Sequence, residues 1–199
     1  MRHVIVTNIV SLDGYYAASD GNPLVLNMDS AFDHYNRERI ESAGTVLLGR
    51  SSFEGFGSYW PHIADAPADP ENPALDEDNR AISRAYNKVA KVVVSDGLEV
   101  PADHPWQAET SVVPRAQAAA WIGEARQDDD SGDILVFGSR VMWNGLLEQG
   151  LVDVLHLMVS PNALGEGVPL FSAPVDLALL ETRRFDGSDN VLLQYAVRR

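Results

Sequence analysis

The feature that most constrains the fold of this chain is a pattern that occurs twice. An apolar run ends at a glycine, and a small hydroxyl residue and an arginine follow near a helix start. The first run, Val46–Leu48, ends at Gly49, and the second, Ile134–Phe137, ends at Gly138. No polar residue alternates within either run, which is typical of a strand covered on both faces. Strands that alternate with helices in this way predict an α/β fold with a mostly parallel sheet.

The stretch after the first run indicates a helix start that can receive a phosphate group. Gly49 permits close backbone approach, and Arg50 supplies a positive charge. Ser51 or Ser52 is expected to cap the helix, and Glu54 has the spacing of a capping box relative to Ser51. Free N–H groups at a helix start, together with an arginine, suit an anion. The alternative is an ordinary turn with a surface arginine, because no full phosphate-binding fingerprint is present.

The second turn repeats this arrangement at Gly138, Ser139 and Arg140. A third apolar run, Lys91–Val94, also ends at a small hydroxyl residue, Ser95, followed by a glycine turn. In a parallel sheet the carboxyl ends of the strands gather at one edge, where ligands usually bind. We therefore expect the two glycine turns to present N–H groups to two parts of one phosphorylated ligand.

The rest of the chain continues the alternation and ends with strands alone. Further strands are expected at Val4–Val10, Thr110–Val113 and Leu151–Ser160, with a terminal antiparallel hairpin at Leu177–Phe185 and Asn190–Val197. Helices are expected at Met28–Ala43, at Asn79–Asn87, from Pro114 onward and after Arg140. Tyr15–Gly21 is expected to be a mobile loop. We find no second domain, so 1–199 is expected to form a single domain.

Two other segments are expected to be irregular. Gly55–Pro61 contains two glycines and three aromatic residues, which predicts a turn that presents rings. These rings either line a pocket for a flat ligand or close the edge of the core, and the core is favoured. Residues 61–78 are rich in proline and carry six acidic residues without a lysine or arginine, which indicates a solvated surface loop. A metal site there is disfavoured by the proline spacing and the lack of supporting histidines.

Charge and composition exclude several functional classes. The net charge of −14 argues against nucleic acid and anionic membranes as partners. It also means that a phosphate-bearing ligand would need a local basic pocket. The absence of cysteine excludes disulfides, thiolate metal sites and a cysteine nucleophile. No apolar run approaches a membrane span, and the N-terminus lacks the pattern of a signal peptide, so a cytoplasmic protein is expected.

Three polar residues have competing interpretations. Asp13 lies in the Ser11–Gly14 stretch, where turn chemistry explains it. Asp33 lies three residues after Ser30, the expected helix cap, so it is explained either as a favourable charge in the first turn or as a carboxylate that faces a cleft. His156 lies among apolar strand residues and is expected to be a satisfied sheet residue rather than a catalytic base.

Several stretches, in this order, resemble one family. They are Ser11–Gly14, Gly49–Glu54, Tyr59–Pro61, Lys91–Ser95, Phe137–Ser139, Leu146–Asp153 and Leu164–Phe171. Together they span nearly the whole chain and resemble the dihydrofolate-reductase-like superfamily. The chain is most similar to the small stand-alone relatives of the reductase domain of bacterial riboflavin biosynthesis (the RibD C-terminal domain). Each stretch is weakly specific alone, and the ordered set is more specific.

The resemblance implies an NADPH-binding reductase fold. By position, Arg50 and Ser95 would hold the adenosine ribose and its 2′-phosphate. The pyrophosphate would lie between the two turns, held by Ser51, Ser52, Gly138, Ser139, Arg140 and Val141. An arginine suits the 2′-phosphate because its planar fork can bond two oxygens.

This chain departs from the family pattern at two positions. The family usually has two adjacent glycines where this chain has Gly138 and Ser139. The added side chain either crowds the pyrophosphate or bonds it. A threonine is common in the family where this chain has Ser52, which is a mild change.

The resemblance also suggests a proton donor and a substrate site. Dihydrofolate reductases have an acidic residue on the first helix at a fixed distance before the Gly-Arg turn, and Asp33 lies at that distance. Riboflavin-type relatives often lack this acid. Asp13 is the competing polar group. Tyr16 and Trp60 are expected to border the substrate. The family commonly forms homodimers, and the C-terminal hairpin is the expected contact.

The resulting expectation is an NADPH-dependent reductase of a small heterocyclic substrate, pterin- or pyrimidine-like. One alternative is the riboflavin-pathway reductase of 5-amino-6-ribosylaminouracil phosphate, which would need a second basic cluster for the substrate phosphate. A second alternative is a non-catalytic nucleotide-binding protein that retains the fold. A deaminase is disfavoured because the Cys/His zinc signature is missing.

Overall fold

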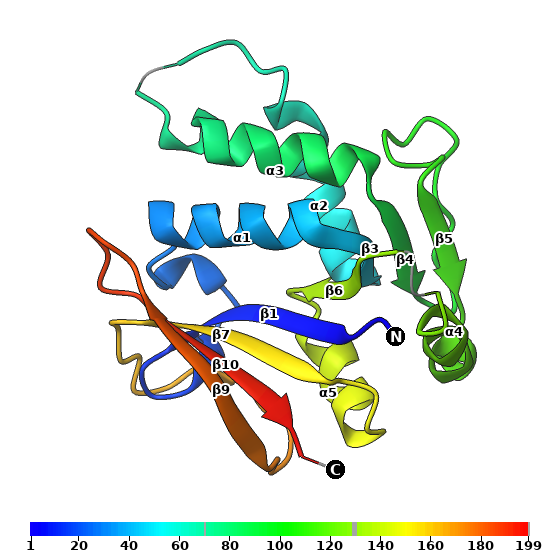
Figure 1. Cartoon of the computed structure of the whole chain (residues 1–199). Coiled ribbons are helices and arrows are strands. Elements are labelled where there is room, and N and C mark those ends of the chain that lie inside the picture. Colours follow the sequence, from blue (N-terminus) through cyan, green and yellow to red (C-terminus); the bar gives the residue numbers. More distant parts are fainter. Residues whose placement is uncertain (70, 129–130, 199) are drawn as a thin grey trace.

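The computed structural model describes residues 1–69, 71–128 and 131–198. Its centre is an eight-stranded sheet with the order β5-β4-β3-β6-β1-β7-β10-β9 (Figure 1). The pairings from β5 to β7 are parallel, and β10 and β9 add an antiparallel edge. The strands are β1 (Val4–Ser11), β3 (Ala43–Gly49), β4 (Ala90–Val94), β5 (Thr110–Val113), β6 (Asp133–Phe137), β7 (Val154–Ser160), β9 (Leu177–Arg184) and β10 (Val191–Val197). The expected α/β fold, mostly parallel with an antiparallel C-terminal hairpin, is therefore confirmed.

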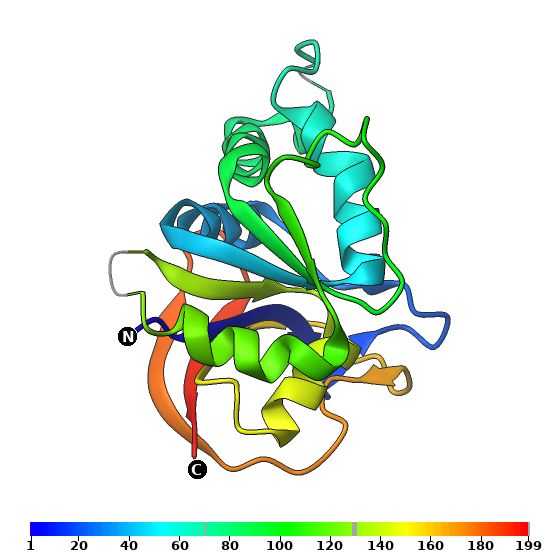
Figure 2. The same ribbon diagram turned by 90° about the vertical axis from the view of Figure 1, so that its right-hand side faces the viewer.

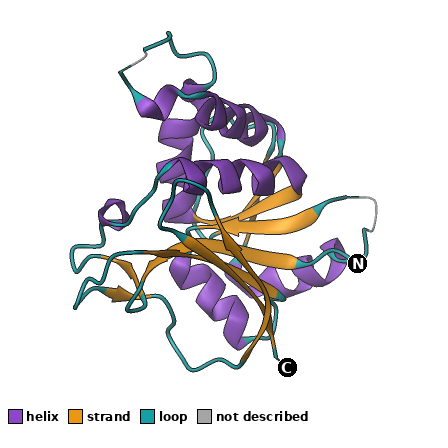
Figure 3. Ribbon diagram, turned by 60° about the vertical axis from the view of Figure 1, so that its left-hand side comes forward, coloured by secondary structure: helices purple, strands orange, loops and turns teal. Residues whose placement is uncertain are grey.

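Helices cover both faces of this sheet (Figures 1 and 3). The helices are α1 (Ser30–Ser42), α2 (Arg50–Ile63), α3 (Glu77–Lys88), α4 (Ala118–Ala125) and α5 (Arg140–Glu148), with short 3₁₀ turns at Pro23–Val25, Pro73–Leu75 and Arg115–Gln117. Buried side chains of α1, α2 and α3 pack on one face, and those of α4 and α5 pack on the other. Among the described residues, no helix combines the length and the apolar character that crossing a membrane requires.

The chain changes from one side of the sheet to the other between β3 and β6. These strands are parallel neighbours, but β3 leads into α2 on one face and β6 leads into α5 on the other. Figure 2 shows α2 starting at the sheet and extending toward α3. Such a change of side is the topological switch point at which open α/β sheets bind ligands. Both glycine turns named above lie there.

The prediction of a ring-presenting turn at Gly55–Pro61 is wrong, because these residues belong to α2. Gly57 lets His104 pack closely on α2: a Cβ there would lie 2.7 Å from Nε2 of His104, so the imidazole would have to move. Pro61 lies in the last turn of the helix. Trp60 packs its ring on Tyr86, with centroids 5.7 Å apart and planes 16° apart, so it lies at the edge of the core.

Two expected loops also differ from the structure. Tyr15–Ala17 forms a strand, β2, that pairs with β8 (Val168–Pro169), so the prediction of a mobile loop is wrong for these residues. The acidic surface loop is shorter than 61–78, because α2 runs to Ile63 and α3 starts at Glu77. Pro70 of that loop, residues 129–130 of the next acidic loop and Arg199 lie outside the described residues.

The cap of α1 is Asp29, so the prediction of Ser30 is wrong by one residue. The carboxylate of Asp29 accepts hydrogen bonds from the backbone N–H groups of Ala31 and Phe32. It also accepts bonds from Ser188 Oγ and Asn190 Nδ2, between β9 and β10. Asp29 is the better cap because its carboxylate bonds the helix start and the hairpin at the same time, whereas the side chain of Ser30 is exposed.

The Asp29→Ala variant is expected to lower the free energy of unfolding by about 2 kcal/mol, because it removes a helix cap. Burial pushes the pKa of Asp29 upward, but its hydrogen bonds with Ser188, Phe32, Asn190 and Ala31 outweigh this effect and lower it. A lowered pKa stabilises the folded state above the ordinary carboxyl value, and this contribution is lost as the pH falls below it. The difference between variant and wild type should therefore shrink in acid, as urea unfolding at several pH values would show. A Ser30→Ala variant that is equally destabilised would contradict this assignment.

Candidate functional site

The turn from β3 to α2 is tied to the turn from β6 to α5. The backbone N–H of Ser139 donates to Ser52 Oγ at 2.9 Å, and the N–H of Gly49 donates to Ser139 Oγ at 3.0 Å. α2 starts at Arg50, with Gly49 as its cap residue, so the predicted capping box is wrong. The Ser52 hydroxyl bonds the other turn, and the Glu54 carboxylate bonds Arg50 Nε at 2.8 Å.

The second turn has an unusual backbone. Gly138 and Ser139 both have positive φ, +53° and +51°, and Ser139 is the only described non-glycine residue with this sign. A Cβ at Gly138 would lie 3.2 Å from Ser52 Oγ, a tight contact, so a glycine is favoured by the positive φ and by the close approach of Ser52. Ser139 is buried, and its hydroxyl serves the protein by accepting from Gly49.

The two helix starts are suited to an anion. Neither α2 nor α5 has a side chain that caps its first turn within the described residues. The first N–H groups of a helix have no partner within it, and the helix dipole adds partial positive charge there. The side chains of Ser52 and Ser139 hold the two starts next to each other, so their N–H groups can converge on one pyrophosphate-sized group.

A third strand end lies at the same edge. Ser95, directly after β4, is buried, and its hydroxyl accepts from Gly97 N at 3.4 Å. Arg50 Nη1 donates to the carbonyl of Gly97 at 3.5 Å. Sequence reasoning missed Asp96 and Arg115 here: the N–H of Arg115 donates to Asp96 Oδ1 at 2.9 Å. The sequence could have pointed to Arg115, because it comes shortly after the expected strand Thr110–Val113, as Arg50 comes after β3.

Arg140 and Val141 lie at the start of α5 but differ in their surroundings. Arg140 Nε donates to the carbonyl of Pro169 in β8, so it ties α5 to the small sheet of β2 and β8. Val141 is 82% exposed, which is unusual for a large apolar side chain. An exposed valine beside free N–H groups can contact a bound ligand.

Asp13 holds the segment between β7 and β8. Its carboxylate accepts from Ser11 Oγ at 2.6 Å, from Leu164 N at 3.1 Å and from Gly165 N at 2.7 Å. The bond from Ser11 is the largest of the effects that lower the pKa of Asp13 to about 2. A carboxylate that is ionised and bonded in this way is suited to positioning a loop, not to donating a proton at neutral pH.

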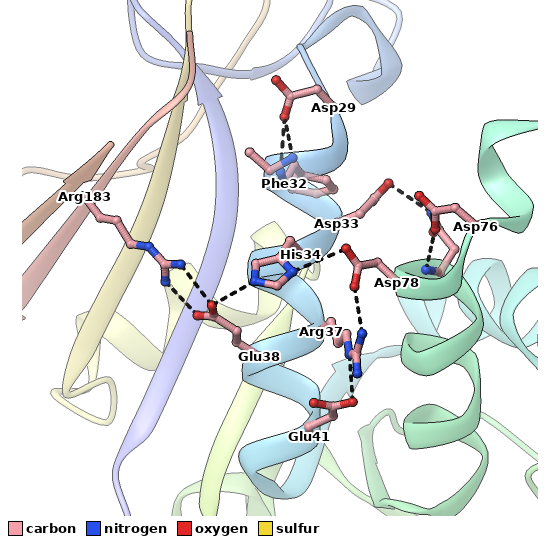
Figure 4. A network of polar contacts seen from close by, with 12 residues as sticks. Asp29, Phe32, Asp33, His34, Arg37, Glu38, Glu41, Asp76, Asp78 and Arg183 are labelled. Carbon is pink, nitrogen blue, oxygen red and sulfur yellow. Dashed lines mark hydrogen bonds and ion pairs between the residues drawn. The ribbon is translucent and has the colours of Figure 1, made fainter. Parts of the chain in front are cut away.

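Asp33 has the opposite properties. It lies in the first turn of α1, and its side chain points to the start of α3, where Asn79 Nδ2 donates to Asp33 Oδ2 at 3.0 Å (Figure 4). Burial raises the pKa of Asp33 to about 6, the bond from Asn79 opposes this, and the nearby charges of Asp76, Asp78 and Asp29 add to it. Asp33 can therefore hold or release a proton near neutral pH.

His156 is a satisfied sheet residue, as its surroundings in the sequence indicated. Its Nδ1 lies 2.7 Å from the hydroxyl of Tyr35, and both residues are buried. Burial lowers the pKa of His156 to about 4, so the ring is neutral at physiological pH.

Among the described residues, no group of three or more histidine, aspartate or glutamate side chains is placed to hold a metal ion.

Substitutions at Ser139 test the link between the turns. Ser139→Ala should destabilise the protein by about 1–3 kcal/mol, because the N–H of Gly49 loses its acceptor in a partly buried place. Ser139→Gly loses the same bond but relieves about 1 kcal/mol of left-handed strain, so it should be the more stable of the two variants. Urea unfolding measures both. A glycine variant that is less stable than the alanine variant would be inconsistent with this geometry.

Asp33→Asn tests the carboxyl with the raised pKa. Between its ordinary pKa of 3.8 and about 6, the folded state keeps a proton that the unfolded state has lost, so wild-type stability falls as the pH rises through this window. The variant lacks this penalty. Its stability relative to wild type should therefore increase between about pH 4 and 6 and then level off. Asp65→Asn, at an exposed position, is the control, and an identical pH profile in both variants would refute the assignment.

Residues 2–191 match the RibD C-terminal domain family. The chain is 24% identical over 193 residues to the uncharacterized protein YyaP of Bacillus subtilis, covering 92% of this chain and 89% of YyaP.

Two solved structures share the fold. A putative riboflavin biosynthesis protein from Shewanella has a TM-score of 0.67 at 20% identity, covering 99% of both chains. Dihydrofolate reductase from Enterococcus faecalis has a TM-score of 0.58 at 16% identity, covering 99% of this chain and 97% of the reductase. The chain therefore belongs to the RibD C-terminal domain family and has the dihydrofolate-reductase-like fold.

Proposed function

We propose that this protein is an NADPH-dependent reductase of a small heterocyclic substrate, pterin- or pyrimidine-like. The observation that carries the proposal is the pair of joined helix starts at Gly49–Ser52 and Gly138–Val141. Family membership supports it, because the RibD C-terminal domain is the reductase part of the family that the sequence resembles.

The residues at these turns fit the cofactor. The positive φ of Gly138 favours a glycine there, and a glycine lets a phosphate approach the backbone closely. Ser51, Ser52, Ser139, Arg140 and Val141 would surround the pyrophosphate. Arg50 and Ser95, at the ends of β3 and β4, would hold the adenosine ribose and its 2′-phosphate.

When bound, the nicotinamide supplies a hydride. The chain itself would orient the substrate and provide a proton. Tyr16 is half-buried, and its hydroxyl lies near Gly138, so it lies beside the second turn. Asp33 is the proposed proton source because its pKa lies near neutrality. Asp13 would act by positioning the loop before β8, and Trp60 would border the site with the part of its ring that Tyr86 leaves uncovered.

Membership of the family also favours a second candidate, the riboflavin-pathway reductase of 5-amino-6-ribosylaminouracil phosphate. Its substrate phosphate would need free cations near Asp33. Arg37, one turn further along α1, is bonded to Asp78 and Glu41. Arg80, next to Asn79, donates to three backbone carbonyls. We therefore favour a substrate other than this phosphate ester.

We extend the proposal to a homodimer that forms through the C-terminal hairpin. β9 is an edge strand of the main sheet, and such edges are templates for pairing with another chain. Leu179 and Leu180 on this strand are 56% and 58% exposed. An exposed apolar edge of this kind supports a contact with a second copy.

Arg50→Ala is the test of the cofactor site. The variant should bind NADPH at least about tenfold more weakly, whereas NADH, which lacks the 2′-phosphate, should be nearly unaffected. Quenching of tryptophan emission reports both affinities, and oxidation of the nucleotide at 340 nm reports turnover with candidate pterins and pyrimidines. Arg84→Ala, which removes an exposed arginine on α3, is the matched control. If the wild type binds neither nucleotide, the proposed function is wrong.

A further inference from the structure

Three neighbouring parallel strands end at the same level on the side of the sheet that holds the two joined turns. In the sheet register Gly49 lies beside Val94, and Val94 lies beside Val113. Each strand end is followed closely by a charged residue: Arg50 after β3, Asp96 after β4 and Arg115 after β5. The topology therefore gathers two arginines and a carboxylate at one edge.

These charges are already paired. The N–H of Arg115 donates to Asp96 Oδ1 at 2.9 Å, and its Nε lies 3.6 Å from Asp96 Oδ2. On the other side of the same turn, Arg50 donates to the carbonyl of Gly97 and is paired with Glu54 at 2.8 Å. The two arginines and the two carboxylates sum to zero charge, and the Arg115–Asp96 side-chain contact is exposed, so an anion at this edge must compete with Asp96 for Arg115.

A groove lies next to Arg50. Its volume is about 470 Å³, within the range of small-molecule sites. Phe53 of α2 and the facing Leu98 and Pro101 give it apolar walls that suit a flat ring. Its lining also includes polar and charged side chains: Arg50, Glu54, Ser58, Glu99 and His104. If the proposed function holds, the adenosine half of the cofactor lies at this edge, with its base in the groove and its ribose near the Asp96–Gly97 turn.

The ribose 2′-groups of NADPH and NADH would interact with Asp96 in opposite ways. The 2′-phosphate of NADPH carries nearly two negative charges, so it is repelled by Asp96 and must compete with it for Arg115. The 2′-hydroxyl of NADH can instead donate to a carboxylate at a strand end, which is how NAD sites are commonly recognised. We propose that Asp96 sets the coenzyme preference of this protein, limiting its preference for NADPH, and that Arg115 becomes a second 2′-phosphate ligand when Asp96 releases it.

The experiment compares the affinities of NADPH and NADH by quenching of tryptophan emission in four full-length proteins. They are the wild type, Asp96→Asn, Arg115→Ala and the control Glu124→Gln. The control removes one negative charge from an exposed position on α4. Asp96→Asn should shift the NADPH/NADH affinity ratio toward NADPH by at least about fivefold, because a competing surface ion pair is removed. Arg115→Ala should weaken NADPH alone by a similar factor.

Each outcome separates the two proposals. If the wild type binds NADPH and Asp96→Asn leaves the ratio within about twofold, or if Glu124→Gln shifts it equally, the role of Asp96 is overturned and the proposed function stands. Repeating the titrations at high salt should reduce the effect of Asp96→Asn, since exposed charges are screened. If the wild type binds neither nucleotide, the proposed function fails, and the role of Asp96 fails with it.

Discussion

The candidate site depends on two hydrogen bonds between turns that are far apart in the sequence. Ser139 donates its N–H to the Ser52 hydroxyl, and its own hydroxyl accepts from the N–H of Gly49. These bonds set the start of α2 against the start of α5, although the two helices cover opposite faces of the sheet. The pairing of β3 with β6 already brings the two turns to one edge, and these bonds fix how the two helix starts face each other. Ser139 adopts a left-handed backbone to make both bonds, and strain of this kind is often kept at functional sites.

Charge is the second constraint, because a chain with a net charge of −14 repels a phosphorylated cofactor. The structure places three arginines, Arg50, Arg115 and Arg140, after the carboxyl ends of β3, β5 and β6, but each already has a partner within the protein. These partners keep the arginines oriented at the sheet edge. A ligand that binds these arginines must replace their contacts with the protein. The groups paired with the arginines therefore affect which ligand binds best.

Most of the fold could be predicted from the sequence, because uninterrupted apolar strands alternating with helices leave few arrangements other than a parallel sheet. The segment Gly55–Pro61 could not, since glycine and proline indicate a turn locally. The close approach of His104 to Gly57 is a tertiary contact, and it favours the glycine within a helix. The cap of α1 was misplaced for a similar reason: Asp29 also bonds the distant residues Ser188 and Asn190.

The site was predicted in part. The two turns are identifiable because glycine, hydroxyl and arginine follow each buried strand. The contacts of Ser52 and Ser139 with each other's turn join residues 87 apart in the sequence, so local spacing suggested a capping box instead. Asp96 and Arg115 were missed because their pairing depends on the register of β4 and β5. The difference between Asp13 and Asp33 likewise follows from contacts with the β7–β8 segment and with α3.

The central claim is that the two helix starts bind one dinucleotide. Backbone ¹H–¹⁵N spectra of this 21.7 kDa chain, recorded while NADPH is added, test it most directly. The account predicts that the largest shifts occur together at the N–H groups of both turns, Arg50, Ser51, Ser52, Arg140 and Val141. Shifts confined to one turn, or shifts that appear only elsewhere on the molecule, would contradict it.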